Sequence, residues 1–110
     1  MAATLDELQQ AAKRIAVKYD ELNRSAGREL WSASDFMAGF VGDVGDLSKL
    51  IMMQSGRRRS DAEIDKKLAH ELSDCLWSIL ILAGRLQIDL ETAFSTTMQE
   101  LEEQFTKGNA

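Results

Sequence analysis

Four acidic residues form two pairs in the middle of this 110-residue sequence. Asp43 and Asp46 make the first pair, and Glu71 and Asp74 make the second. Because residues three apart share one face of an α-helix, each pair places two carboxylates side by side. Hard cations such as Mg²⁺ take carboxylate, phosphate and water oxygens as ligands. The two pairs therefore predict a four-carboxylate metal site, provided that their helices meet.

The positions of the pairs along the chain allow them to meet in an antiparallel hairpin. One helix is expected to end near Gln54 and the next to begin near Asp61. Asp46 then lies about eight residues before the turn and Glu71 about ten after it, which is roughly 12 and 15 Å at a rise of about 1.5 Å per residue. We therefore expect both pairs at nearly the same height.

The rest of the sequence is typical of a single all-α domain over residues 1–110. It contains no proline, and its apolar residues recur at spacings of three and four, as in amphipathic helices. Helices are predicted over 5–25, from about 34 to 54 or 55, over 61–86 and over 90–105. Thr4 and Ser60 begin capping boxes, Ser32 or Ser34 could cap the second helix, and Asp89 could cap the fourth. We predict a four-helix antiparallel bundle.

Two of these helices carry apolar faces that bear on assembly. The fourth helix is expected to turn Leu90, Phe94, Met98, Leu101 and Phe105 inward. The third helix is apolar on two sides, and its second side, with Trp77, Leu80 and Ile81, predicts a subunit interface. Because one core of this size is only modestly stable, we expect a homo-oligomer.

Charge and composition exclude several classes of function. The net charge of −5 argues against a nucleic-acid-binding surface, which needs basic side chains to neutralise phosphates. The single cysteine, Cys75, excludes an intrachain disulfide and fits a reducing compartment. The apolar run from Cys75 to Ala83 is too short to span a bilayer, and no signal-peptide pattern is seen. We expect a cytoplasmic protein with no membrane partner.

The two acidic pairs and their neighbours resemble the signature of the MazG-like, all-α nucleoside triphosphate pyrophosphohydrolases. That signature is Glu-x-x-Glu, a variable gap, then Glu-x-x-Asp, and it corresponds here to Gly42–Leu47 and Glu71–Leu76. The segment Leu82–Leu90 also resembles the stretch that usually follows. The resemblance covers roughly Trp31 to Ala93.

The resemblance implies a helical bundle assembled as a homodimer or a dimer of dimers. It also implies Mg²⁺-dependent cleavage of a nucleoside triphosphate to the monophosphate and pyrophosphate, with Mn²⁺ as a substitute metal. The implied metal ligands are Asp43, Asp46, Glu71 and Asp74, and Asp43 and Glu71 are the implied catalytic carboxylates. The sequence departs from the family in having aspartates in the first pair, Ser78 where an aromatic is common, and no Asn or Lys within Thr97–Glu100.

Several further side chains are candidates to contact a nucleotide. Trp31, just before the second helix, could stack on a base or pack within the connection. Lys49 and Lys67 could contact phosphates or form helical ion pairs with nearby acids. Ser78 and Arg85 lie on the same arc of the third helix as Glu71 and Asp74. The arginines at 57–59 could touch phosphate or simply be solvated.

Other functions remain open at this stage. The chain could bind a nucleotide or metal without hydrolysis, or serve as a helical oligomerisation module. Three glycines, Gly39, Gly42 and Gly45, weaken the second helix and suggest close approach by a ligand or another helix. A di-iron site is disfavoured because His70, the only histidine, has no acid three residues before it. A nucleophilic hydrolase is disfavoured because Cys75 lacks a His–acid partnership.

Overall fold

The computed structural model describes residues 2–56 and 62–108, and all regular structure in these ranges is α-helical. Helix α1 runs over Leu5–Ser25, α2 over Ala33–Ser55, α3 over Ala62–Arg85 and α4 over Leu90–Thr106. These bounds confirm the predicted all-α class and fall within one or two residues of the predicted ends. The arginines at 57–59, with Ser60 and Asp61 of the predicted second capping box, lie outside the described residues.

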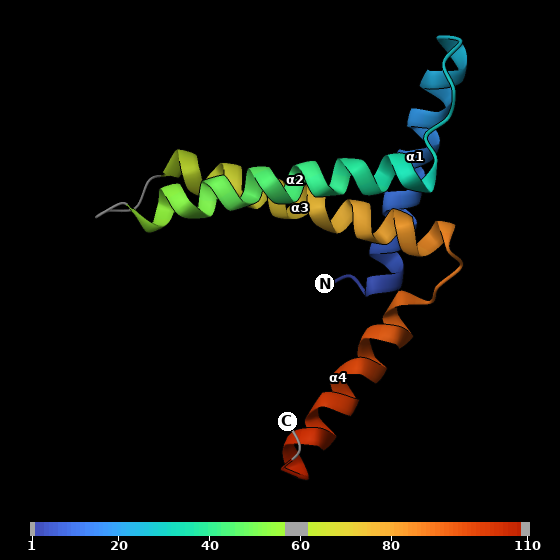
Figure 1. Ribbon diagram of the computed structural model, residues 1–110. Helices are drawn as coiled ribbons and strands as arrows, with labels where there is room; N and C mark the ends of the chain where they lie inside the picture. The colour runs from blue at the N-terminus through green and yellow to red at the C-terminus, as the bar shows by residue number, and fades with distance from the viewer. Residues whose placement is uncertain (1, 57–61, 109–110) are drawn as a thin grey trace.

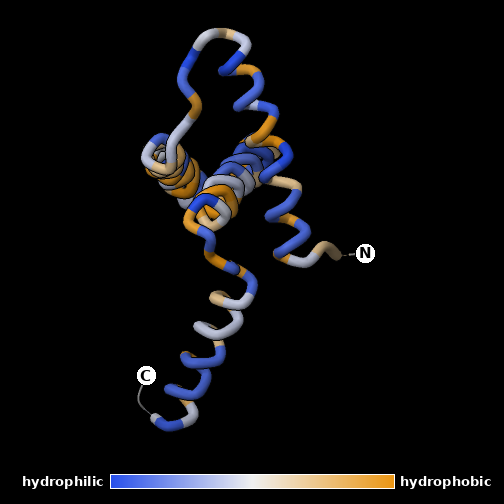
Figure 2. The backbone as a smooth tube through the Cα atoms, turned by 90° about the vertical axis from the view of Figure 1, so that its right-hand side faces the viewer, coloured by the Kyte–Doolittle hydropathy of each residue, from blue (hydrophilic) through white to orange (hydrophobic). Residues whose placement is uncertain are grey.

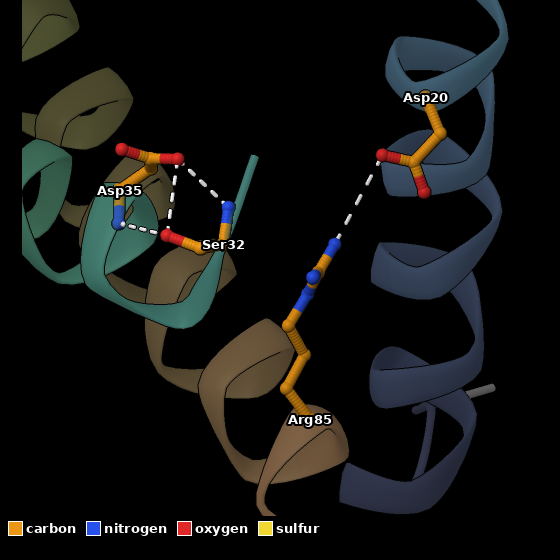
Figure 3. A network of polar contacts seen from close by, with 4 residues as sticks. All are labelled: Asp20, Ser32, Asp35 and Arg85. Carbon is orange, nitrogen blue, oxygen red and sulfur yellow. Dashed lines mark hydrogen bonds and ion pairs between the residues drawn. The ribbon is translucent and has the colours of Figure 1, made fainter. Parts of the chain in front are cut away.

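Side-chain caps explain where the helices begin. Thr4 and Glu7 form the predicted capping box at α1. Of the two serines predicted as possible caps of α2, Ser32 is the N-cap. Its hydroxyl accepts a hydrogen bond from the backbone N–H of Asp35 at 3.2 Å, and Oδ2 of Asp35 accepts one from the backbone N–H of Ser32 at 2.8 Å (Figure 3). These hydrogen bonds from Ser32 lower the pKa of Asp35. Both caps satisfy backbone donors that a helix leaves unpaired at its start.

Helices α2 and α3 lie side by side as an antiparallel hairpin, and α1 crosses the carboxyl-terminal half of α3 (Figure 1). The crossing is close because α1 presents small residues, Ala12 and Ala16, to α3. The indole Nε1 of Trp77 donates to the carbonyl of Ala12 at 3.3 Å across this contact. The buried cluster at the crossing comprises Ala12, Ala16, Phe36, Leu80 and Ile81.

This core corrects the predicted role of the second apolar side of α3. Leu80 and Ile81 are 4% and 5% exposed, and α1 of the same chain covers them. That side of α3 is therefore intrachain core and not a subunit interface. Its other side, with Leu72 and Ile79, is the one left exposed.

Helix α4 departs from the closed antiparallel arrangement. The chain leaves α3 through Gln87, which has a left-handed φ of 57° and lets the N–H of Ile88 donate to the carbonyl of Ala83 at 2.9 Å. Helix α4 then leads away from the hairpin and contains no buried residue (Figure 1). The prediction that Phe94 and Phe105 face inward is wrong: they are 57% and 73% exposed, because no described helix of this chain covers them.

Exposed apolar side chains are also frequent on the other three helices. Figure 2 looks along the hairpin: hydrophobic and hydrophilic residues alternate along α1, whereas α4 is coloured mostly as hydrophilic or intermediate. Within residues 2–56 and 62–108, none of the helices combines the length and the apolar character required to cross a bilayer.

Candidate metal centre

The hairpin brings together three of the four acids that the sequence singled out. Asp43 and Asp46 come from α2 and Glu71 comes from α3, and one oxygen from each lies within 4.8 Å of the other two. The register of the antiparallel pair places residues 43–46 beside residue 71, as their distances from the turn predict. The three carboxylates form what we call the acid cluster.

Burial and mutual repulsion disfavour the ionised form of two acid-cluster carboxylates, those of Asp43 and Glu71. Burial raises the pKa of Asp43, and repulsion by Asp74 and Asp46 raises it further. Burial likewise raises the pKa of Glu71, with added repulsion from Asp43, Asp74 and Asp46. The Oε2 atom of Glu71 is shielded from solvent and accepts no hydrogen bond from the described part of the chain. A buried carboxylate oxygen without a donor is an energetic cost that a bound cation removes.

Asp74, the fourth predicted ligand, stands beside the cluster but is engaged elsewhere. Its Oδ2 lies 3.1 Å from Nε2 of His70, one helical turn earlier on α3. His70 is largely exposed, as predicted, whereas its contact with Asp74 escaped the sequence reasoning. The spacing of four residues is the signal that could have revealed it. Asp74 still acts on the cluster, because its charge raises the pKa of Asp43 and Glu71.

The donor set fits a hard divalent cation. Mg²⁺–oxygen bonds of about 2.1 Å at right angles place neighbouring ligand oxygens about 3 Å apart. The carboxylates of the acid cluster can reach that spacing through changes of side-chain rotamer. Cys75, one turn after Glu71, is buried, and burial together with the nearby acids raises the pKa of its thiol. The side chains that converge are Asp43, Asp46 and Glu71, without Cys75, so the ligands are all oxygen, which favours Mg²⁺ or Mn²⁺ over soft metals.

Two solvent-open hollows meet at Asp43, beside the acid cluster. One has a volume of about 510 Å³ and is lined by residues of the α1–α2 connection, α2 and α3. The other has a volume of about 500 Å³ and lies between α1, Asp43 and α3. Both volumes are in the range of small-molecule sites, roughly 300–1,000 Å³. The residues common to both hollows are Trp31, Asp43 and Trp77.

Aromatic rings form the wall of these hollows. The ring of Trp31 lies 5.1 Å from that of Tyr19 and 5.7 Å from that of Phe36, measured between centroids. Phe36 lies 5.4 Å from Trp77. Trp31 is 37% exposed, so one part of it packs in the connection while another faces the hollows. The two sequence interpretations of Trp31 are thus compatible, and its exposed part is available to an aromatic ligand.

The remaining predicted contact residues have different positions. Ser78 is buried and lines the first hollow together with Trp31 and Asp43. Lys49 and Lys67 are exposed, and neither lines these two hollows. Arg85 lies about 21 Å from Glu71 along the axis of α3. Its guanidinium stacks 4.8 Å from the Phe36 ring centroid and approaches Asp20 at 3.9 Å (Figure 3). Arg85 therefore contacts the aromatic wall through Phe36 and takes no part in the acid cluster.

The glycines of α2 are not required for helix packing within the chain. A Cβ atom added at Gly39, Gly42 or Gly45 would meet no atom of the described residues within 4 Å. Gly39 lines the first hollow together with Asp43. The absence of a side chain at Gly39 widens that hollow, which favours the ligand-clearance interpretation there.

No protein-family model matches this chain, and no curated protein sequence matches it. The acid cluster, the hollows beside it and their aromatic wall are the features from which a function can be inferred.

Proposed function

We propose that this protein is a metal-dependent nucleoside triphosphate pyrophosphohydrolase of the MazG-like type. It would convert a ribo- or deoxyribonucleoside triphosphate to the monophosphate and pyrophosphate. One observation carries the proposal: three carboxylates from two antiparallel helices converge beside aromatic-walled hollows that can hold a nucleotide. The resemblance of both acidic pairs to the family signature points to the same reaction.

The metal-binding role falls to Asp43, Asp46 and Glu71, with Asp74 joining them when its side chain leaves His70. When bound, Mg²⁺ would neutralise part of the negative charge of the triphosphate and lower the pKa of a coordinated water. An anionic substrate needs this help, because the cluster itself is negative and the protein carries a net charge of −5. Removal of the metal should therefore weaken substrate binding as well as turnover.

Asp43 and Glu71 are also the proposed proton acceptors, each through an oxygen that does not bind the metal. A carboxylate within hydrogen-bond reach of the attacking water can act as its general base. In the proposed reaction a water oxygen bonds to the α-phosphorus, the bond from that phosphorus to the bridging oxygen breaks, and pyrophosphate leaves. The carboxylate takes the proton that the water loses.

The hollows account for the nucleoside part of the substrate. A base stacked on an aromatic side chain gains about 1–3 kcal/mol regardless of its identity, since every base has a π-face. Trp31 offers such a surface, and the hydroxyl of Ser78 lies in the lining of the same hollow. The proposal includes the homo-oligomeric assembly that the family resemblance implies and the cytoplasmic location expected from the sequence.

The test is pyrophosphate release from a panel of ribo- and deoxyribonucleoside triphosphates with Mg²⁺, Mn²⁺ or chelator. We expect release with either metal and none with chelator. Glu71→Gln and Asp43→Asn should reduce kcat by at least about 100-fold, since each removes a metal ligand and a candidate base. Circular dichroism should show unchanged helix content in both variants.

Glu100→Gln is the matched control for Glu71→Gln, because Glu100 is an exposed acid on α4, away from the cluster. It should retain wild-type turnover. Normal turnover by Glu71→Gln or by the chelated protein would refute the proposal. If the folded protein releases no pyrophosphate yet binds nucleotide with Mg²⁺ in calorimetry, the non-catalytic binding function replaces it.

A further inference from the structure

A cleft lies where α1 crosses α3, and the proposed reaction does not use it. It has a volume of about 270 Å³ and lies between the side of α1 that bears Lys13 and the carboxyl-terminal half of α3. The buried side chains of Ala16, Leu80 and Ile81 form its apolar floor. We call it the crossing cleft. Its volume is below the roughly 300–1,000 Å³ of sites for drug-sized ligands, so it suits a molecule smaller than a nucleotide.

The guanidinium of Arg85 lines the crossing cleft with its hydrogen-bond donors unused. It stacks on the ring of Phe36, 4.8 Å from the centroid, and this contact holds the guanidinium in place. The carboxylate of Asp20 stands 3.9 Å away, beyond hydrogen-bond distance (Figure 3). No residue in 2–56 or 62–108 accepts a hydrogen bond from this guanidinium. A fixed guanidinium with free donors is suited to bind a carboxylate or a phosphate through two parallel hydrogen bonds.

The surroundings of the crossing cleft are positively charged although the chain is acidic. The lining contains two cations, Lys13 and Arg85, and one acid, Asp20. A neighbouring hollow on α1 shares Lys13 and adds two further cations and one further acid, namely Arg14, Lys18 and Glu21. The chain as a whole has a net charge of −5. A local excess of positive charge of this kind attracts small anions to α1 over distances of about 8–10 Å at physiological salt.

Gly84 keeps the crossing cleft open. A Cβ atom added at Gly84 would meet, among the described residues, only the side-chain nitrogen of Gln9, at 3.6 Å. That distance is an ordinary van der Waals contact, so helix packing does not require a glycine at this position. Because glycine weakens the body of a helix relative to alanine, its presence needs another reason. Clearance for a ligand supplies one.

We propose that the crossing cleft binds a small organic monoanion, namely a carboxylate with a short apolar body. The guanidinium of Arg85 donates two hydrogen bonds to the carboxylate, and the ammonium of Lys13 adds a positive charge at the rim. The apolar body lies on the floor, where its surface is removed from water. One negative charge balances the excess positive charge of the lining, whereas a triphosphate carries more charge than the lining can balance. The inference does not depend on the proposed reaction, because Arg85 lies about 21 Å from Glu71 along α3.

Isocaproate is the probe, and isocaproamide and acetate are its matched controls. In a titration of the full chain followed by heteronuclear NMR, isocaproate should bind saturably and shift the backbone amide signals of Ala16, Leu80 and Gly84. Isocaproamide lacks the charge and acetate lacks the apolar body, so each should bind at least about 10-fold more weakly. Chelator is present throughout, because it keeps metal out of the acid cluster and confines carboxylate binding to the cleft.

Variants of the lining test each part of the site. Arg85→Gln should weaken isocaproate binding roughly 10- to 100-fold, because it removes hydrogen bonds between two charged groups. Lys13→Gln, a change on the exposed rim, should weaken binding by a smaller factor. Arg24→Gln is the matched control for Arg85→Gln, because Arg24 is an exposed arginine of α1 that lines neither the cleft nor its neighbouring hollow. It should bind isocaproate like the wild type.

Gly84→Leu separates the cleft from the charges around it. This variant keeps both cations of the lining and fills the cleft, so it should lose isocaproate binding while thermal unfolding shows that the fold is retained. Equal affinity for isocaproate and isocaproamide, an equal loss in Arg24→Gln, or normal binding by Gly84→Leu would overturn the proposal. Absence of saturable isocaproate binding by the folded wild type would overturn it as well, whatever the outcome of the pyrophosphate-release assay.

Discussion

Replacing Glu71 by glutamine should change the melting temperature of this protein in opposite directions with and without Mg²⁺. In metal-free protein, burial and the neighbouring acids raise the pKa of Glu71 above its value in the unfolded chain. Between those two pKa values the folded protein binds more protons than the unfolded chain, so stability falls as pH rises. At neutral pH the ionised carboxylate therefore destabilises the fold, and its Oε2 accepts no hydrogen bond from residues 2–56 and 62–108. Glutamine removes the charge, so without metal the variant should melt at a higher temperature than the wild type.

With Mg²⁺ the order should reverse. A cation that binds only the folded state adds about 2.7 kcal/mol at a concentration 100 times its Kd. For a chain of this length each kcal/mol raises Tm by roughly 4 °C, which gives a rise of roughly 10 °C. The glutamine variant keeps Asp43 and Asp46 of α2 but, on α3, only Asp74, which is engaged with His70, so most of this rise should disappear. Wild type should then be the more stable protein.

The assay is thermal unfolding followed by circular dichroism at fixed protein concentration, with chelator and with increasing Mg²⁺. The control is Glu100→Gln, which should follow the wild type in both conditions. Equal Mg²⁺ stabilisation of wild type and Glu71→Gln would show that the acid cluster does not bind the cation. A chelated variant that melts well below the chelated wild type would show that Glu71 has a stabilising contact in the fold, and would refute the electrostatic reasoning.

Three further outcomes are expected. Trp31→Ala should raise KM for nucleoside triphosphates by roughly 5- to 150-fold, the equivalent of about 1–3 kcal/mol of base stacking. Trp31→Phe should keep most of the affinity. An unchanged KM in steady-state kinetics would show that Trp31 does not contact the substrate. Leu80→Ala should destabilise the protein by about 2–5 kcal/mol in urea denaturation, because Leu80 is buried where α1 crosses α3; a loss below about 1 kcal/mol would contradict that core. Asp89→Ala should reduce the helix content of α4, since the Asp89 carboxylate accepts hydrogen bonds from Thr92. Those bonds lower the pKa of Asp89 in the folded chain. The stability that Asp89 contributes is therefore complete above the ordinary aspartate pKa and is lost as pH falls through the lower pKa of the folded chain. Hydrogen exchange of α4 that does not change on acidification would contradict this.

The helices and the meeting of the acids follow from local sequence patterns. Helix ends were predictable because capping depends on residues three apart, as in Thr4–Glu7 and Ser32–Asp35. The acid cluster was predictable because helical rise converts sequence distance from a turn into height along a hairpin. The sequence therefore predicts that the two acidic pairs lie at nearly the same height on the paired helices.

What the sequence determined is the class of the fold, the position of its helices and the carboxylates that converge. What only the tertiary structure decided is which apolar side of each helix is covered, because periodicity marks a side as apolar without naming its partner. Helix α1 covers Leu80 and leaves Leu72 exposed, and α4 leaves Phe94 uncovered. The fold likewise decided that the Asp74 carboxylate contacts His70, because both His70 and the acid cluster lie close to it.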